Sequence, residues 1–260
     1  MPLPLLHLVG AGFSGRLVAH VISLHPPGCA HHKSNPKCLM PDLPQMLRSL
    51  WNIKSSTDFR PRLIVDVGAC TGTSGLYGLF KEPDPLYLLI EPQSEFNSRL
   101  ERYMVGKTHR ILNCCLAASR GTAEFKIAPN KDSSHLALPG ASFGPTVKTI
   151  SVPVDTLDSL VEENLPAAAE KLIDMVVKID VQGAELQVLQ GGIGTLSKHN
   201  AVLIVEIGTG RDEAIRVFSL LDSLGYVLVD CFDFVKFKGA HRITSQLDAV
   251  FAKKTLRIAK

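Results

Sequence analysis

The sequence predicts an α/β protein with a doubly wound, mostly parallel sheet of seven strands. From residue 62 onward, apolar runs of strand length alternate with helical patterns. Two of these runs, in residues 63–72 and 178–192, end in an acid and continue through glycine into a helix. Between them, another run ends in the acid-proline pair Glu91-Pro92. Acids at several strand ends indicate a ligand site at the carboxyl edge of a parallel sheet.

The first half of the pattern alternates regularly. Each apolar run predicts a strand, and each segment after a turn predicts a helix. The second helix opens at Ser94 and has Glu95 in its first turn, where a carboxylate suits the helix dipole. The expected strands are residues 63–67, 86–90 and 110–114, and the expected helices are residues 72–80 and 94–104.

The second half departs from this rhythm. Two expected strands, residues 122–128 and 147–152, have no long helix between them, and the Ser-, Gly- and Pro-rich residues 129–145 predict a loop. The last expected strand follows another strand directly, which suits an antiparallel insertion at one edge. The remaining expected helices are residues 157–163, 183–190 and 212–224, and the remaining strands are residues 174–179, 202–205, 226–229 and 247–252.

The N-terminal part differs in composition from the rest. Residues 25–47 hold five of the sixteen prolines, which predicts an irregular connector. We therefore expect residues 1–55 to form a partly helical extension with this Pro-rich connector, and residues 56–260 to form the α/β domain.

Composition and charge exclude several classes of partner. The net charge is +3 and no basic stripe is present, so we expect no nucleic-acid partner. No apolar run approaches the ~18 residues that span a bilayer.

The spacing of the six cysteines suggests no disulfide framework, which favours reduced thiols and a cytoplasmic protein. The acid-free residues 1–41 leave organellar import open. Four residues near the N-terminus are potential zinc ligands, namely Cys29, His31, His32 and Cys38. They lack the paired Cys-x-x-Cys spacing of zinc sites, so we predict no metal site there.

The chemistry of the first two strand ends favours a nucleoside with an amino-acid tail. Gly68 and Gly72 permit a tight turn and close approach of a ligand. Asp66 beside the loop would repel phosphate and favour a cationic or amino-bearing ligand. Glu91, roughly 20 residues beyond the loop, stands where a carboxylate binds both ribose hydroxyls. S-adenosylmethionine fits this combination, and NAD fits it poorly.

These motifs resemble those of the FkbM family of class I S-adenosylmethionine-dependent methyltransferases. The likeness covers about residues 60–253 and rests on the segments Asp66–Gly72, Glu91-Pro92 and Lys178–Gly191, with further family features at Gly121–Phe125 and Val154–Asp158. It implies a Rossmann-like methyltransferase domain and O-methyl transfer to a small-molecule or glycan hydroxyl. The expected cofactor-binding residues are Asp66, Gly68, Ala69, Cys70, Gly72, Glu91, Pro92, Cys115 and Leu116.

Two residues depart from the family pattern. Cys70 replaces the usual Asn of the first motif, and both side chains are small enough for the turn. Gln182 replaces the usual Glu of the signature, so a base or metal role of that Glu cannot be carried over. Because of the second departure, an alternative to the enzyme is a binding protein that keeps the cofactor-binding fold but does not catalyse methyl transfer.

Asp180 and His135 are the candidate catalytic residues. Asp180 ends the fourth parallel strand and could orient or deprotonate the acceptor, or cap the following helix. His135 lies in the Ser-rich loop and could act as a base near neutral pH. Lys178 is expected to pair with Asp66 or with Glu206, which could alternatively serve the acceptor pocket.

Glu185, in the first turn of the helix after Asp180, is expected to have a structural role. A competing motif, Gly10-Ala-Gly-Phe-Ser-Gly15, spells the dinucleotide fingerprint G-x-G-x-x-G. No second strand ending in an acid follows it, so an NAD- or FAD-dependent oxidoreductase remains only an alternative.

Overall fold

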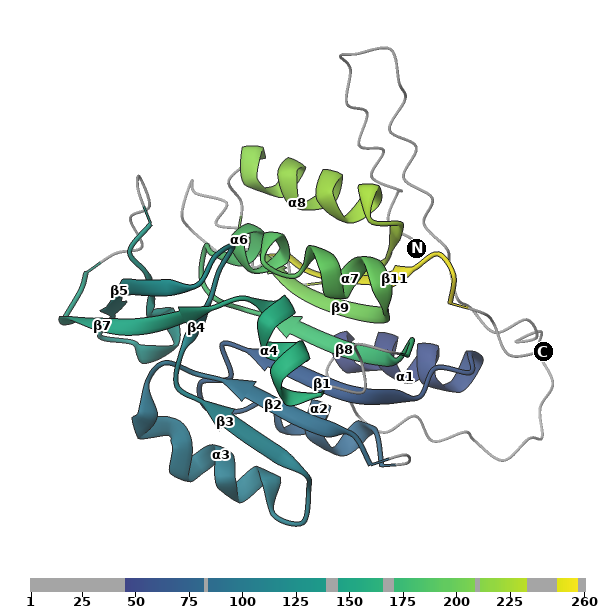
Figure 1. The fold of residues 1–260 in the computed structure, drawn as a ribbon, viewed down its shortest axis with the longest axis horizontal. Helices are drawn as coiled ribbons and strands as arrows, with labels where there is room; N and C mark the ends of the chain where they lie inside the picture. Colours follow the sequence, from purple (N-terminus) through teal and green to yellow (C-terminus); the bar gives the residue numbers. More distant parts are fainter. Residues whose placement is uncertain are drawn as a thin grey trace, which may run out of the picture.

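The computed structural model describes residues 45–81, 84–138, 145–165, 171–208, 211–232 and 247–256 (Figure 1). The competing fingerprint at residues 10–15 and the potential zinc ligands at residues 29–38 lie outside these ranges. None of the helices in the described ranges is both long and apolar enough to cross a bilayer.

The main sheet has seven strands in the order β10-β11-β9-β8-β1-β2-β3 (Figure 1). Its strands are β1 (Pro61–Val67), β2 (Leu86–Ile90), β3 (His109–Leu112), β8 (Asp174–Ile179), β9 (Asn200–Ile207), β10 (Tyr226–Phe232) and β11 (Leu247–Lys253). Strands β9, β8, β1, β2 and β3 are neighbours in this order, and each neighbouring pair among them is parallel. Strand β11 pairs antiparallel with both β9 and β10. This arrangement confirms the predicted doubly wound, mostly parallel seven-stranded sheet and its antiparallel insertion.

Helices cover both faces of this sheet, because the central strands are apolar on both sides. One core cluster joins α4 (Leu157–Asn164), α6 (Glu185–Gln190), α7 (Ile193–Lys198) and α8 (Arg211–Ser223) to one face. The other cluster joins α1 (Gln45–Ser56), α2 (Ser74–Leu79) and α3 (Asn97–Met104), which follows the 3-10 helix η1 (Ser94–Phe96).

Helix α1 lies inside the expected N-terminal extension and yet belongs to the core. Leu47, Leu50 and Ile53 are buried in the same cluster as β1 and β2 residues. The Ser49 hydroxyl also donates to Asp230 Oδ2 on β10 at 2.8 Å. The expected boundary at residue 55 therefore falls between segments that share one hydrophobic core.

A second sheet of four strands is inserted between β3 and α4. It has the order β4-β7-β5-β6 and comprises β4 (Cys115–Leu116), β5 (Gly121–Ile127), β6 (His135–Leu136) and β7 (Lys148–Asp155). The sequence predicted β5 and β7 but a plain loop over residues 129–145. That prediction was wrong in part, because β6 and the 3-10 helix η2 (Lys131–Ser133) lie in this segment.

Candidate active site

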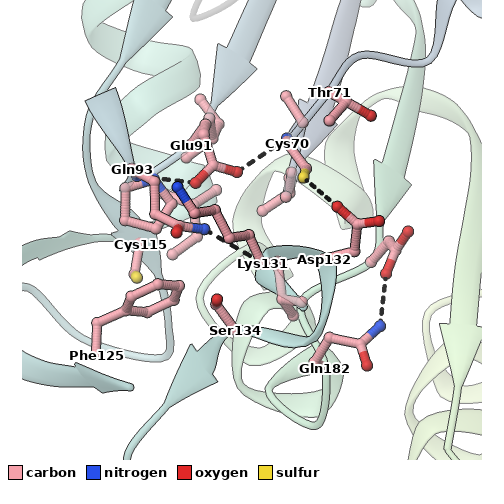
Figure 2. Close-up of a pocket in the computed structure, with 18 of the residues that line it drawn as sticks. Cys70, Thr71, Glu91, Gln93, Cys115, Phe125, Lys131, Asp132, Ser134 and Gln182 are labelled. Atoms are coloured by element: carbon pink, nitrogen blue, oxygen red, sulfur yellow. Dashed lines mark hydrogen bonds between the residues drawn. The ribbon is translucent and has the colours of Figure 1, made fainter. Parts of the chain in front are cut away.

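A cavity of about 430 Å³ opens at the carboxyl ends of β1, β2 and β8. This volume lies within the range of roughly 300–1,000 Å³ that small-ligand sites occupy. The loops after these strands line it together with residues of the second sheet and of η2 (Figure 2). The residues singled out from the sequence that line it are Gly68, Ala69, Cys70, Gly72, Glu91, Pro92, Cys115, Leu116, Lys178, Asp180, Gln182 and Glu206.

The glycine loop after β1 is held by its neighbours on both sides. The backbone N–H groups of Gly68 and Ala69 both donate to the Ile90 carbonyl at 3.0 Å. Gly68 has φ +77°, and a Cβ there would lie 1.9 Å from the Asp180 carbonyl oxygen. The sequence explained this glycine by the approach of a ligand. The structure adds a more direct reason, since the chain leaving β8 already occupies the space of a side chain.

Glu91 is a buried carboxylate on the cavity wall. One oxygen accepts the Cys70 N–H at 2.9 Å, and the other accepts the Gln93 N–H at 2.8 Å (Figure 2). Burial raises the pKa of Glu91, and these two N–H groups oppose the rise. Each oxygen retains a lone pair, so the carboxylate can accept hydrogen bonds from two neighbouring hydroxyl groups of a ligand.

Asp66 lies beneath the cavity and does not line it. One carboxylate oxygen accepts the Tyr77 hydroxyl, and the other lies 3.5 Å from Lys178 Nζ. The same ammonium lies 3.1 Å from Asp180 Oδ2. The expected pairing of Lys178 with Asp66 is confirmed. Asp66 influences the cavity indirectly, because the Lys178 ammonium that it binds also pairs with Asp180 on the cavity wall.

Asp180, Gln182 and Glu206 form a hydrogen-bonded cluster on the cavity wall. The Gln182 amide donates to Asp180 Oδ1 at 3.1 Å and to Glu206 Oε2 at 2.5 Å. Burial and the neighbouring Asp180 raise the pKa of Glu206 to about 9. Burial also disfavours the charged form of Asp180, but the Lys178 ammonium and the hydrogen bonds from neighbouring side chains together outweigh it and lower the pKa of Asp180. At neutral pH Asp180 is therefore ionised and Glu206 carries a proton.

Helix α6 begins too late for Asp180 to cap it. The helix starts at Glu185, and its N-cap position is Ala184, with no side-chain cap. The Glu185 carboxylate itself accepts the Gly183 N–H at 3.0 Å and the Val181 N–H at 3.3 Å. The structural role expected for Glu185 is confirmed, and the capping alternative for Asp180 is not supported.

The 3-10 helix η2 closes the cavity from the side of the second sheet. The Cys70 thiol donates to Asp132 Oδ1 at 3.1 Å, and Lys131 Nζ pairs with Glu95 at 2.5 Å. Burial and the bond to Asp132 raise the pKa of the Cys70 thiol to about 12, so it stays protonated. These contacts join η2 to the loop after β1 (Figure 2) and to η1.

Sequence comparison identifies the family to which these motifs belong. The model of the methyltransferase FkbM domain matches residues 66–228, which is 163 of the 260 residues. The chain belongs to the FkbM methyltransferase family. This membership confirms the resemblance predicted from the motifs and supports S-adenosylmethionine as the cofactor. No curated protein shows significant sequence similarity to this chain.

Three solved methyltransferase structures are similar to this FkbM chain at low identity. The FkbM methyltransferase of Methylobacillus flagellatus KT is 15% identical with a TM-score of 0.45, covering 74% of this chain and 44% of that one. Precorrin-6y C5,15-methyltransferase of Geobacter metallireducens GS-15 is 13% identical with a TM-score of 0.41, covering 85% and 93%. M. jannaschii TYW2, in complex with AdoMet, is 12% identical with a TM-score of 0.36, covering 85% and 80%. This chain thus spans less than half of the M. flagellatus protein.

The two departures from the FkbM pattern occupy unusual backbone positions. Cys70 has φ +42° and Gln182 has φ +55°, and they are the two non-glycine residues of the described ranges with positive φ. Asn is enriched at such positions, which explains the usual residue at position 70. At position 182 the amide donates to two carboxyl groups, which a carboxylate could not do.

His135 does not line the cavity, in contrast to its expected role as a base. Its ring is buried, and Nδ1 lies 3.1 Å from the Ser133 carbonyl oxygen. Leu136, the next residue of β6, does line the cavity. Adjacent side chains of a strand point to opposite faces, so the position of Leu136 explains why His135 does not reach the cavity.

Several residues of this FkbM site had no signal in the sequence. Lys131, Asp132 and Ser134 line the cavity, but they come from a segment without motif or periodicity. Gln93 could have been noticed, because it follows the acid-proline pair directly. Within the described ranges, no group of three or more His, Cys, Asp or Glu side chains could hold a metal ion.

Proposed function

We propose that the protein transfers the methyl group of S-adenosylmethionine to a hydroxyl group of a small molecule or glycan. The observation that carries this proposal is the position of Glu91 beside the glycine loop, in a cavity of an FkbM family chain. The four cysteines in the described ranges are free thiols, which supports a cytoplasmic location.

Charge on the cavity wall suits a cationic cofactor. Glu91, Asp132 and Asp180 line the cavity, while the two lysines that line it are paired, Lys178 with Asp66 and Asp180, and Lys131 with Glu95. We assign Glu91 to the ribose hydroxyls and the apolar side of the cavity, including Cys115 and Leu116, to the base. When bound, the cofactor supplies an activated methyl group on a positively charged sulfonium.

The acceptor side of the cavity favours a ligand that donates hydrogen bonds. Lys178 and the Gln182 amide both donate to carboxyl groups of the protein. What remains exposed to the cavity is mainly the acceptor capacity of the Asp180 and Asp132 carboxylates. A hydroxyl group meets this requirement, whereas a phosphate or carboxylate on the acceptor would meet like charge.

Asp180 is the residue that we assign to deprotonate the acceptor. The acceptor oxygen forms a bond to the methyl carbon, the bond from sulfur to that carbon breaks, and the hydroxyl proton passes to Asp180. A base is useful because the pKa of an alcohol lies far above neutral. Lys178 keeps Asp180 ionised and ready to accept that proton.

Titration with S-adenosylhomocysteine tests the cofactor assignment. The product should bind and raise the melting temperature, since binding to the native state stabilises it. Glu91→Ala should weaken binding by about 1.5–3 kcal/mol for each charge-assisted hydrogen bond lost. Glu101→Ala is the matched control, because that carboxylate pairs with His109 on the surface. Wild-type protein that fails to bind S-adenosylhomocysteine would overturn the proposed function.

Gln182 motivates a second candidate function. If the missing carboxylate is needed for turnover, the chain would bind the cofactor without transferring its methyl group. Incubating cell extracts with the protein and methyl-labelled cofactor separates the two candidates. Label transferred to an extract component supports the enzyme, and binding without transfer, restored to transfer by Gln182→Glu, supports the second candidate.

A further inference from the structure

Gln93 lines the cavity, and its side chain holds a buried hydrogen-bond acceptor. The side chain is 5% exposed, and its Oε1 atom has no hydrogen-bond partner within the described structure. Such an atom is also found on Asp66, Asn164 and Gln187, but of these four described residues only Gln93 lines the cavity. A buried carbonyl oxygen without a donor is costly, so a ligand that supplies an N–H group would bind favourably here.

The neighbouring groups fix the orientation of the Gln93 amide. Its Nε2 atom donates to the Lys131 carbonyl at 3.5 Å, so Oε1 is the atom left for a ligand (Figure 2). Turning the amide over would place two carbonyl oxygens against each other. Lys131 cannot move away freely, because its ammonium pairs with Glu95 at 2.5 Å. Position 93 therefore accepts a hydrogen bond from a ligand and cannot readily donate one.

The location of Gln93 identifies the part of the ligand that it meets. Its backbone N–H donates to Glu91 Oε1 at 2.8 Å, so the two residues are direct neighbours on the cavity wall. Figure 2 shows Gln93 on the side of the cavity where Cys115 and Phe125 lie. With the ribose at Glu91, the base attached to that sugar reaches this apolar wall. Flat aromatic rings suit such a surface, and their polar edge needs a partner.

We propose that Gln93 recognises the exocyclic amine of the cofactor's adenine and thereby selects adenosyl over 6-oxopurine ligands. This inference rests on the proposed function, because it takes the cofactor to be S-adenosylmethionine. The adenine amine donates to Oε1 and satisfies it. A hypoxanthine ring carries a carbonyl oxygen at the same position, which would oppose Oε1 and leave both oxygens without a donor.

Calorimetric titration of the full chain with two ligands tests the proposal without any acceptor. The ligands are S-adenosylhomocysteine and its deaminated analogue, S-inosylhomocysteine. Wild-type protein should bind the adenosyl ligand about 10- to 100-fold more tightly, as expected for one buried hydrogen bond exchanged for an unpaired acceptor. Gln93→Leu should bring the ratio of the two affinities close to one.

Gln187→Leu is the matched control. Gln187 is also a glutamine with an unpaired buried Oε1, but it lies on α6 and does not line the cavity. That variant should keep the wild-type ratio. A wild-type ratio near one, or a ratio unchanged in Gln93→Leu, would overturn the inference while leaving the proposed function intact. Binding of neither ligand by the wild type would overturn the proposed function and this inference together. A wild-type ratio near one overturns the inference even if Gln93→Leu does not fold.

Discussion

Asp180 and Glu206 are carboxyl groups at the ends of neighbouring strands, and their pKa values are shifted in opposite directions. Lys178 lies 3.1 Å from Asp180 and keeps it ionised, while burial and the charge of Asp180 keep Glu206 protonated. Gln182 joins the two by donating to both. The result at the scale of single residues is one strong acceptor and one carboxylic acid side by side, which is suited to taking up a proton from a hydroxyl group.

Asp180→Asn should change the preference between two cofactor analogues. Sinefungin carries an amine where the transferred methyl group stands, so an ionised Asp180 should favour it over S-adenosylhomocysteine. Asn keeps the shape but removes the charge, and the preference should fall by about 10- to 100-fold. Competition binding measures the ratio. Glu91→Gln is the control, because it should weaken both analogues alike. An unchanged preference in Asp180→Asn would remove this residue from the methyl-transfer point.

Glu206→Gln should alter how stability depends on pH. The folded-state pKa of about 9 lies above that of an unfolded glutamate, so the native state binds the extra proton. This contribution is complete below about pH 4.3 and is lost as pH rises through about 9. The groups that act on Glu206 are Asp180, Asp248, Glu185 and Lys178.

Glutamine cannot ionise, so the wild type should lose stability relative to Glu206→Gln as pH rises over this window. Urea unfolding of both proteins at several pH values measures the difference. A constant difference from pH 5 to pH 10 would mean that Glu206 ionises normally.

At the scale of elements, the site depends on how closely the loops after β1 and β8 approach. Gly68→Ala would place a Cβ 1.9 Å from the Asp180 carbonyl oxygen, at a backbone φ of +77°. We expect a loss of at least ~2 kcal/mol in unfolding free energy and weaker binding of S-adenosylhomocysteine. Gly78→Ala on α2 is the control, because a Cβ there meets no atom within 4 Å. That helical substitution should stabilise by about 0.5–1 kcal/mol.

The elements that sequence could predict are those with a local pattern. Strands β1, β2 and β8 were found because their apolar runs end in an acid and a turn, and two of these acids, Glu91 and Asp180, line the cavity. Strand β6 is two residues long and exists through its pairing with β5, which no local pattern records. The position of His135 was misjudged for the same reason, because its direction depends on that pairing.

The roles of two predicted acids also needed the structure. Asp66 and Asp180 both end apolar strands, and from the sequence we expected Asp66 to bind the cofactor and Asp180 to act on the acceptor. Only the packing shows that Tyr77 binds Asp66 and that Asp66 lies beneath the cavity, whereas Asp180 lies on its wall. Glu206 lies next to Asp180 because β9 pairs with β8, which is a contact between distant parts of the chain.

At the scale of the whole molecule, one cavity lies between two sheets. The main sheet supplies the glycine loop and Glu91, and the second sheet supplies Phe125 and the η2 residues. We expect this to be the cofactor site of the chain, with none in residues 1–55. Gly12→Val should therefore leave affinity for S-adenosylhomocysteine unchanged, and NADH should not bind.

Gly72→Val is the comparison for that experiment. Gly72 has φ +93°, and a Cβ there would lie 2.8 Å from the Tyr103 ring, so this variant should lose affinity. Calorimetry with both ligands gives the answer for each variant. Tight binding of NADH that Gly12→Val abolishes would instead favour the oxidoreductase alternative.

The position of strand β11 determines when the main sheet can be completed during synthesis. It is the last strand of the described residues, and yet it lies between β9 and β10 and pairs with both. A ribosome releases the N-terminal parts first, so β10 emerges before the strand that connects it to the sheet. Until Lys253 is available, β9 presents an open edge in the main sheet, and open edges pair readily with other chains. The nascent protein therefore passes through a period in which the β9 edge can pair with other chains and aggregate. Pairing of β9 with β11 ends that exposure.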